Sequence, residues 1–190
     1  MNRSAIDFLL SRRSAATPLA EPGPTPEQLE LILQAATTVP DHGQLKPYRF
    51  VVVQGEARAR FGDALAAAGA ENNPALTAPM ADKLRGKAFA APALVAIVSS
   101  PKPGKIPEWE QAVSASCTGF AIALAADAIG LAASWKSAGA MDGSLLREAL
   151  RMAPGERLLG WVLLGQHARP LPEGRRAPVD LAGLVTTLEP

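Results

Sequence analysis

The sequence is poor in the residues that build disulfides and metal sites. Among 190 residues there is one cysteine, Cys117, and there are two histidines, His42 and His167. A single cysteine cannot form an internal disulfide, and its isolation does not indicate an oxidising compartment. Two histidines and one cysteine are too few for a structural zinc site. We therefore expect no metal and a cytoplasmic protein, and we interpret Cys117 as a small buried apolar residue.

A dominant charge and a long apolar run are also missing. The chain has 19 Lys and Arg against 18 Asp and Glu, a formal net charge of +1. Nucleic-acid binding needs a concentrated basic face, so we expect no nucleic-acid partner. The longest apolar region, 120–133, is interrupted by Asp127 and is shorter than the ~20 residues that span a membrane. No signal peptide is recognisable, and we expect no membrane association.

Several catalytic motifs are absent as well. The chain has no Gly-x-Gly-x-x-Gly after a strand, no Walker loop, no His-Glu-x-x-His, no Cys-x-x-Cys and no Gly-x-Ser-x-Gly. What is present is a chain that is 48% hydrophobic, enough for a sizeable core, with a length that fits one domain. We expect a single domain over residues 1–190. The Pro- and Arg-rich segment from about residue 167 to 190 is expected to form an arm of that domain.

Apolar periodicity predicts alternating helices and strands. The predicted strands are Phe50–Gln54, Ala93–Ser99, Leu131–Trp135 and Leu158–Leu164, of which the first two are expected to be buried on both faces. The predicted helices are 4–13, 25–39, 56–68, 79–89, 107–130 and 144–152. Thr25 followed by Pro26 and Gln28 is a strong start signal for the second helix. Helices separate most strands while the connections vary, which favours an α+β fold with a mixed sheet.

The predicted helix from Pro107 to Gly130 is dominated by Ala, Ser, Gly and Cys. These small residues occur all around the helix, and a helix that is apolar on every side is buried on every side. In a chain of this length, such burial suggests a second subunit.

A polar loop lies directly before the first predicted strand. His42, Gln44 and Lys46 alternate, so in extended backbone all three side chains would point the same way. Loops that carry polar groups to the end of a buried strand often form ligand sites. An ordinary solvated loop explains these residues equally well.

Three further groups of cations stand at the ends of predicted elements. Arginine side chains can bind phosphate oxygens through two parallel hydrogen bonds, but cations are also common at helix C-termini. For Arg12-Arg13-Ser14 taken alone, the helix C-terminus is the stronger explanation. Trp135 with Lys136 and Ser137 combines an amphipathic aromatic, a cation and a hydroxyl, or else is a core-edge Trp beside a solvated Lys. The groups are Arg12-Arg13-Ser14, Trp135-Lys136-Ser137 and Arg175-Arg176.

Taken in this order, the segments resemble the nitroreductase family of FMN flavoproteins, and most closely its compact YdjA-like NAD(P)H nitroreductase branch. The resemblance runs from Leu10 to about Pro178. Its motifs are Arg12-Arg13-Ser14, Pro40-Asp41-His42, Pro47-Tyr48-x-Phe50, Pro107 with Trp109-Glu110, and Trp135-basic-Ser137. The chain departs from the family at Gln44 and Lys46, where many members carry Asn and Gln, and at Lys136, where Arg is common.

The resemblance implies a nitroreductase-like fold, with a mixed, mostly antiparallel sheet flanked by helices, in a homodimer with FMN at the interface. The long helix 107–130 would form much of that interface. Arg12, Arg13 and Ser14 would hold the FMN phosphate and ribityl chain, with Arg175 or Arg176 adding to the phosphate site. The residues that would reach the flavin ring are Thr38, His42, Gln44, Lys46, Trp135, Lys136 and Ser137, with Thr38 and His42 directed to the partner's flavin.

The implied activity is transfer of electrons from NADH or NADPH through FMN to a small-molecule acceptor, a nitroaromatic, a quinone or a similar oxidant, by a ping-pong mechanism. No protein nucleophile is needed, and Lys46 and Lys136 are candidates to stabilise the anionic reduced flavin. Three alternatives remain: another flavin-dependent reductase on the same scaffold, an FMN-binding dimer without turnover, and a purely structural helical dimer.

Overall fold

The computed structural model describes residues 5–171 and 174–188 of the chain. It divides into two compact units, one formed by residues 14–170 and the other by the N-terminal segment through Arg13 with the chain from Leu171 onward. Helix α1 (Ala5–Ser11) belongs to the small unit. The helix start predicted at Ser4 lies outside the described residues. Within the described ranges, no helix has the length and apolarity to cross a bilayer.

The main unit is built on a four-stranded sheet. Its strands are β1 (Tyr48–Gln54), β2 (Ala93–Ser99), β3 (Ala132–Lys136) and β4 (Arg157–Gly165), in the order β1-β2-β4-β3. All four predicted strands are confirmed, and β2 has the predicted limits. Every residue of β2 is buried, as expected. β1 is an edge strand with Val52 37% exposed, so its expected burial on both faces is wrong for the single chain.

All pairings between the four strands are antiparallel. The α+β class is therefore confirmed, and the expected mixed character of the sheet is corrected. The reason lies in the strand order. β2 and β3 run in the same direction, but β4 is inserted between them in the opposite direction. No two neighbouring strands of this sheet are therefore parallel.

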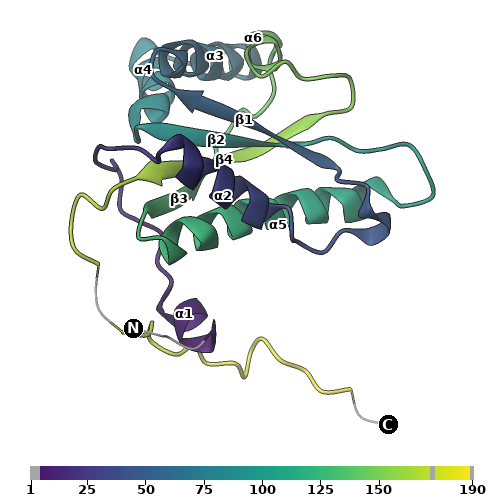
Figure 1. Cartoon of the computed structure of the whole chain (residues 1–190). Helices are drawn as coiled ribbons and strands as arrows, with labels where there is room; N and C mark the ends of the chain where they lie inside the picture. The colour runs from purple at the N-terminus through teal and green to yellow at the C-terminus, as the bar shows by residue number, and fades with distance from the viewer. Residues whose placement is uncertain (1–4, 172–173, 189–190) are drawn as a thin grey trace. The chain divides into compact units, whose positions relative to one another are not determined.

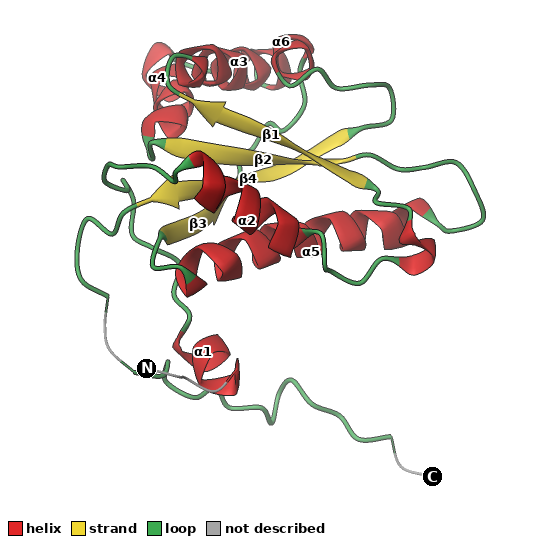
Figure 2. Cartoon of the chain, in the orientation of Figure 1, coloured by secondary structure: helices red, strands yellow, loops and turns green. Residues whose placement is uncertain are grey.

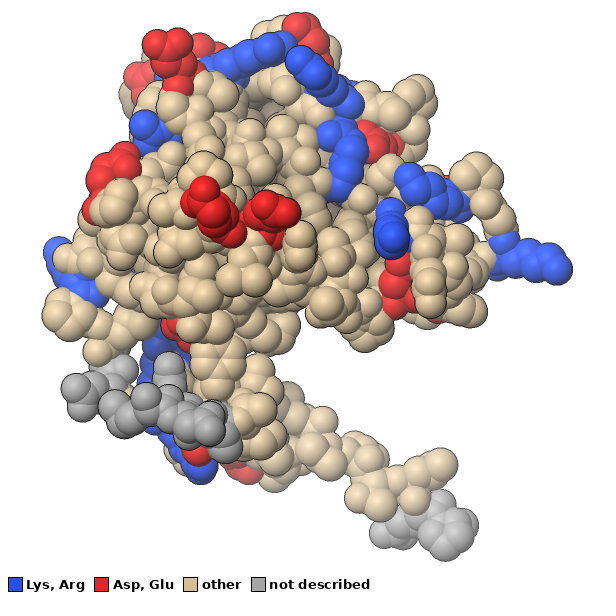
Figure 3. Space-filling view, in the orientation of Figure 1, with Lys and Arg blue, Asp and Glu red and all other residues tan. Residues whose placement is uncertain are grey.

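Helices cover both faces of this sheet (Figure 1). On one face lie α3 (Ala57–Asn72), α4 (Ala78–Gly86) and α6 (Ser144–Ala149), and on the other lie α2 (Pro26–Ala36) and α5 (Glu108–Ala128). Two short 3₁₀ helices, η1 (His42–Gln44) and η2 (Lys87–Phe89), precede β1 and β2. Figure 2 shows the helical layers in red on either side of the yellow strands. On the visible face, basic and acidic side chains are interspersed (Figure 3).

The start of α2 follows directly from the sequence. The N–H of Gln28 donates to Oγ1 of Thr25 (3.2 Å), and the N–H of Thr25 donates to Oε1 of Gln28 (3.0 Å). Pro26, at the first helical position, has no N–H to leave unpaired. The predicted capping signal is therefore confirmed.

The small residues of α5 allow the helix to approach the sheet closely. A Cβ atom built at Gly119 would collide with the ring of Trp135 and with Ile97. Apolar side chains of α5 also remain partly exposed in the single chain, where Val113 is 54% and Phe120 46% exposed. Burial of α5 on every side therefore stays a prediction that requires a second subunit.

Candidate functional site

The polar loop before β1 is ordered by Asp41. Its carboxylate accepts hydrogen bonds from the backbone N–H of Leu45 (3.2 Å) and of Lys46 (2.7 Å). These bonds close a turn in which Gly43, Gln44 and Lys46 have positive φ angles of 72°, 53° and 48°. The loop is therefore not extended, and the alternation expected to align its side chains is wrong. Backbone strain of this kind persists only where the surroundings hold it, and Asp41 does so here.

The same loop is anchored on the first turns of α5. The Nδ1–H of His42 donates to Oε1 of Glu110 (2.7 Å), and the hydroxyl of Ser114 donates to the carbonyl of Pro40. The hydroxyl of Thr38 donates to the carbonyl of Ala35 (2.8 Å) at the end of α2. The His42 side chain is 66% exposed, so its ring reaches solvent while one nitrogen is fixed. Glu110 therefore sets which face of the ring the loop presents.

A second group of predicted residues gathers at the outer edge of β3. The backbone N–H of Ala15 donates to the carbonyl of Ala133 (2.9 Å), which brings Ser14 beside the strand that carries Trp135 and Lys136. The ring of Trp135 is directed toward Gly119 of α5. Successive residues of a strand point to opposite faces, so Lys136 is directed to the α3 side. Ser14 thus lies along the same sheet edge as residues 135–137, in a cluster that extends over the length of β3.

Lys87, which sequence reasoning did not single out, joins this cluster. Its Nζ donates to the carbonyl of Ser137 (2.8 Å). Burial and then the charges of Lys83 and Lys136 lower the pKa of Lys87, so the three ammonium groups lie within electrostatic range. No local sequence signal predicts this contact, because the partner is a backbone carbonyl 50 residues away. The loop after β3 therefore carries a concentration of positive charge.

Four of the described arginines belong to the small unit. The guanidinium of Arg13 donates to the carbonyls of Ser11 and Gly174, and the backbone N–H of Arg176 donates to the carbonyl of Leu10. The Nε of Arg175 donates to Asp7 (2.9 Å). These contacts bring together Arg12-Arg13 and Arg175-Arg176, as a shared phosphate site requires. Arg176 differs from Arg175 in that its guanidinium makes no hydrogen bond or ion pair with any described residue.

The two clusters of the main unit stand on opposite edges of the sheet. The loop of His42 leads into β1, and the loop of Ser137 follows β3. Three strand spacings, about 14 Å, separate these two strands. A single small ring therefore cannot bridge both edges within one chain. Which of these residues hold a ligand stays a prediction.

Comparison with known proteins identifies the family. The model of the nitroreductase family matches residues 9–166. The chain is 37% identical over 165 residues to the YdjA protein of Escherichia coli strain K12, which is named provisionally as an NAD(P)H nitroreductase, and the match covers 85% of this chain and 87% of that protein. A Haemophilus influenzae protein with the same provisional name is 36% identical over 159 residues, with 83% and 85% covered.

Solved structures share the fold at low sequence identity. The nitroreductase-like family protein of Bacillus cereus has a TM-score of 0.83 at 23% identity, with 100% of this chain and 98% of that chain covered. The FMN and NADPH-dependent nitroreductase NfnB from sphigopyxis sp. strain HMH has a TM-score of 0.73 at 20% identity, with 98% and 100% covered. The predicted nitroreductase-like fold is thus confirmed, and the chain belongs to the nitroreductase family.

Proposed function

We propose that the protein is an FMN-dependent NAD(P)H oxidoreductase of the nitroreductase type. The names of the Escherichia coli and Haemophilus influenzae relatives and of NfnB support a reduced nicotinamide as electron donor, and that of NfnB supports FMN. The observation that carries the proposal is the cluster of Ser14, Lys87, Lys136 and Ser137 at the edge of β3. It joins cations and backbone along one strand edge without any described carboxylate paired to these lysines.

The donor groups of the small unit fit a phosphate. The segments that carry four arginines contact each other, and Asp7 is the carboxylate that pairs with Arg175. Arg175 is held by Asp7 and Arg13 by backbone carbonyls, whereas the guanidinium of Arg176 is not engaged by a described residue. We therefore assign Arg176 to the phosphate and add Arg12 on the family resemblance, with Arg13 and Arg175 as the residues that fix the arm beside α1. Bidentate guanidinium–phosphate pairs suit this donor set.

The residues of the main unit fit the ring of a flavin. Lys136 and Lys87 would face the side of the ring that carries negative charge when the flavin is reduced, and Ser14 would bind the chain that leads to the phosphate. The Trp135 ring is fixed between Gly119 of α5 and Gly160 of β4, and it supports strand β3. When bound, FMN would take a hydride from NADH or NADPH and pass the electrons to an acceptor that occupies the same place afterwards.

A homodimer is part of the proposal. Thr38, His42, Gln44 and Lys46 stand on the edge of the sheet opposite Lys136, so they would reach a flavin held by the partner subunit. Exposed apolar side chains support such an assembly. They are Val113 and Phe120 on α5 and Val179, Leu181, Leu184, Val185 and Leu188 in the arm. We keep the cytoplasm as the expected location.

The test is a visible absorption spectrum of the purified protein before and after anaerobic addition of NADH or NADPH. We expect a flavin band that the reduced nicotinamide bleaches. A band that persists would favour the FMN-binding dimer without turnover. No band after incubation with FMN would contradict the proposal. Arg12→Ala should weaken FMN retention, and a purified variant with full FMN occupancy would refute the phosphate assignment.

A further inference from the structure

A cavity of about 480 Å³ lies between α3, α4 and the segment after Ser137. Its size falls within the usual range of small-molecule pockets. Gly69 of α3, which lines it, allows Leu84 of α4 to pack closely, because a Cβ atom there would collide with Leu84. Its lining is mainly apolar, with Leu76, Met80 and Leu84 on one side and Gly139 and Ala140 on the other. Such walls suit a flat apolar body, and the Met80 thioether favours an aromatic one.

Two lysines supply the charge of this cavity. Lys83 in the last turn of α4 and Lys87 in η2 are four residues apart, and both line it. None of the residues that line the cavity carries a carboxylate. Nearby Arg85 shows the contrast, since its guanidinium is bound by Asp63 and Asp82. The cavity therefore combines an apolar interior with uncompensated positive charge.

The two lysines differ in their hydrogen-bond partners. Nζ of Lys87 donates to the carbonyl of Ser137, which ties it to the loop after β3. Lys83 makes no hydrogen bond or ion pair with the residues that the structure describes. The pKa of Lys87 is lowered by burial and then by Lys83 and Lys136, so an anion placed among them would relieve repulsion. Lys83 is thus the ammonium group that remains available to an anion in the cavity.

We infer that this cavity is a binding site for small aromatic carboxylates, selected by Lys83, and that they are electron acceptors of the enzyme. The second clause rests on the proposed function, because Gly139 and Ala140, which line the cavity, follow Ser137 in the loop after β3, and Lys87 joins the two. The apolar walls hold the ring and Lys83 binds the carboxylate. Reduction of 4-nitrobenzoate to 4-nitrosobenzoate would consume one NAD(P)H and one proton and release NAD(P)⁺ and water.

The test compares 4-nitrobenzoate with its neutral methyl ester. For each acceptor, kcat/KM is measured with FMN-loaded wild type, with Lys83→Met and with Lys105→Met. Methionine keeps the length of the side chain and removes the charge, and Lys105 is an exposed lysine outside the cavity. We expect the acid-to-ester ratio of kcat/KM to fall about tenfold in Lys83→Met, the size of one charge-assisted hydrogen bond. The ratio should not change in Lys105→Met.

Calorimetric titration with 4-nitrobenzoate, without reduced nicotinamide, separates the two levels of the inference. We expect the dissociation constant to rise about tenfold in Lys83→Met and also to rise with salt. If the acid binds in this Lys83-dependent way but neither acceptor is reduced, the carboxylate site stands and the proposed reaction fails. If both acceptors are reduced and Lys83→Met changes neither the ratio nor the binding, the inference is overturned and the proposed function stands.

Discussion

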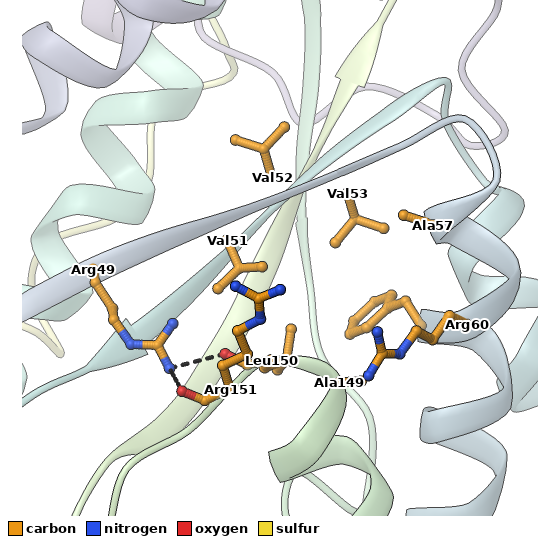
Figure 4. A pocket seen from close by; sticks show the side chains of 10 residues that line it. Arg49, Val51, Val52, Val53, Ala57, Arg60, Ala149, Leu150 and Arg151 are labelled. Carbon is orange, nitrogen blue, oxygen red and sulfur yellow. Dashed lines mark hydrogen bonds between the residues drawn. The ribbon is translucent and has the colours of Figure 1, made fainter.

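The cavities that border helix α3 include two that are lined by more than one basic side chain. One, of about 290 Å³, lies between β1, α3 and α6, and Arg49, Arg60 and Arg151 line it (Figure 4). The other is the larger cavity of Lys83 and Lys87. A count of cations alone would rank the arginine cavity as the better anion site. The structure lowers that count, because the fold already uses the charge of Arg49 and Arg60 lies beside Glu148, which leaves Arg151 as the lining cation without a hydrogen bond or ion pair from its guanidinium to a described residue.

Both members of the ion pair of Arg49 have several hydrogen-bond partners. Its guanidinium donates to both carboxylate oxygens of Glu156 and to the carbonyls of Leu150 and Arg151, two bonds that are drawn in Figure 4. Glu156 also accepts from the backbone N–H of Ala153 (2.9 Å). The group therefore ties β1 to the segment between α6 and β4. Cations in a cavity indicate a ligand only where the fold has left them without a partner.

The largest effect is expected when this ion pair is broken. Arg49→Met leaves the carboxylate of Glu156 buried, since its side chain is 8% exposed. We expect a loss of about 3 kcal/mol in the free energy of unfolding, measured by urea denaturation. Arg60→Met is the matched control, because Arg60 and Glu148 are 64% and 71% exposed and such pairs contribute roughly 0–1 kcal/mol. Equal losses of unfolding free energy in the two variants would contradict the distinction between the buried Arg49–Glu156 pair and the exposed Arg60–Glu148 pair.

Acid should weaken the same ion pair. Hydrogen bonds from Arg49 lower the pKa of Glu156 from 4.5 to about 2. Because the folded-state pKa is the lower one, the pair stabilises fully above about pH 5, and this contribution is lost as the pH falls toward 2. We expect wild type to lose roughly 2 kcal/mol more than Glu156→Gln over that interval. Parallel stability curves for the two proteins would contradict the assigned shift.

The contrast between the cavities also shows what the sequence could reveal. Elements came from local patterns: the Thr25 capping signal, the small-residue helix and the apolar strand from Ala93 to Ser99 were all predicted. The hydrogen-bond partners of the cations could not be predicted from local sequence patterns. Arg49 and Glu156 are 107 residues apart, and Lys87 finds Ser137 across 50 residues. Only the fold decides which cation is paired.

Local patterns also failed to predict the strand pairing of the sheet and the conformation of the polar loop. Helical connections between strands suggested some parallel pairing, but the insertion of β4 between β2 and β3 excludes it. The alternation of His42, Gln44 and Lys46 suggested a shared face, but the carboxylate of Asp41 closes the backbone into a turn. Periodicity describes a regular element correctly and cannot describe a loop that one side chain orders.

A smaller effect is expected when Lys87 is changed, and it concerns the cofactor. Lys87→Met removes a cation beside Ser137 and so should destabilise the reduced, negatively charged flavin. For a two-electron couple, a loss of about 1–2 kcal/mol lowers the reduction potential by about 20–40 mV. An anaerobic dye-coupled titration measures it, with Lys105→Met as the control. Lys46→Ala should act in the same direction if Lys46 reaches the partner's flavin. An unchanged potential in either variant would remove that lysine from the role.

The smallest effect is expected for Lys83, and it is the most discriminating. Lys83 has no partner among the described residues and repels Lys87, so the fold gains nothing from its charge. We expect Lys83→Met to change the free energy of unfolding by less than about 0.5 kcal/mol. The pKa of Lys87 should rise, because one of the charges that depress it is gone. A loss above about 1 kcal/mol would mean that the fold uses Lys83 as it uses Arg49, and Lys83 would then not be available to an anion in the cavity.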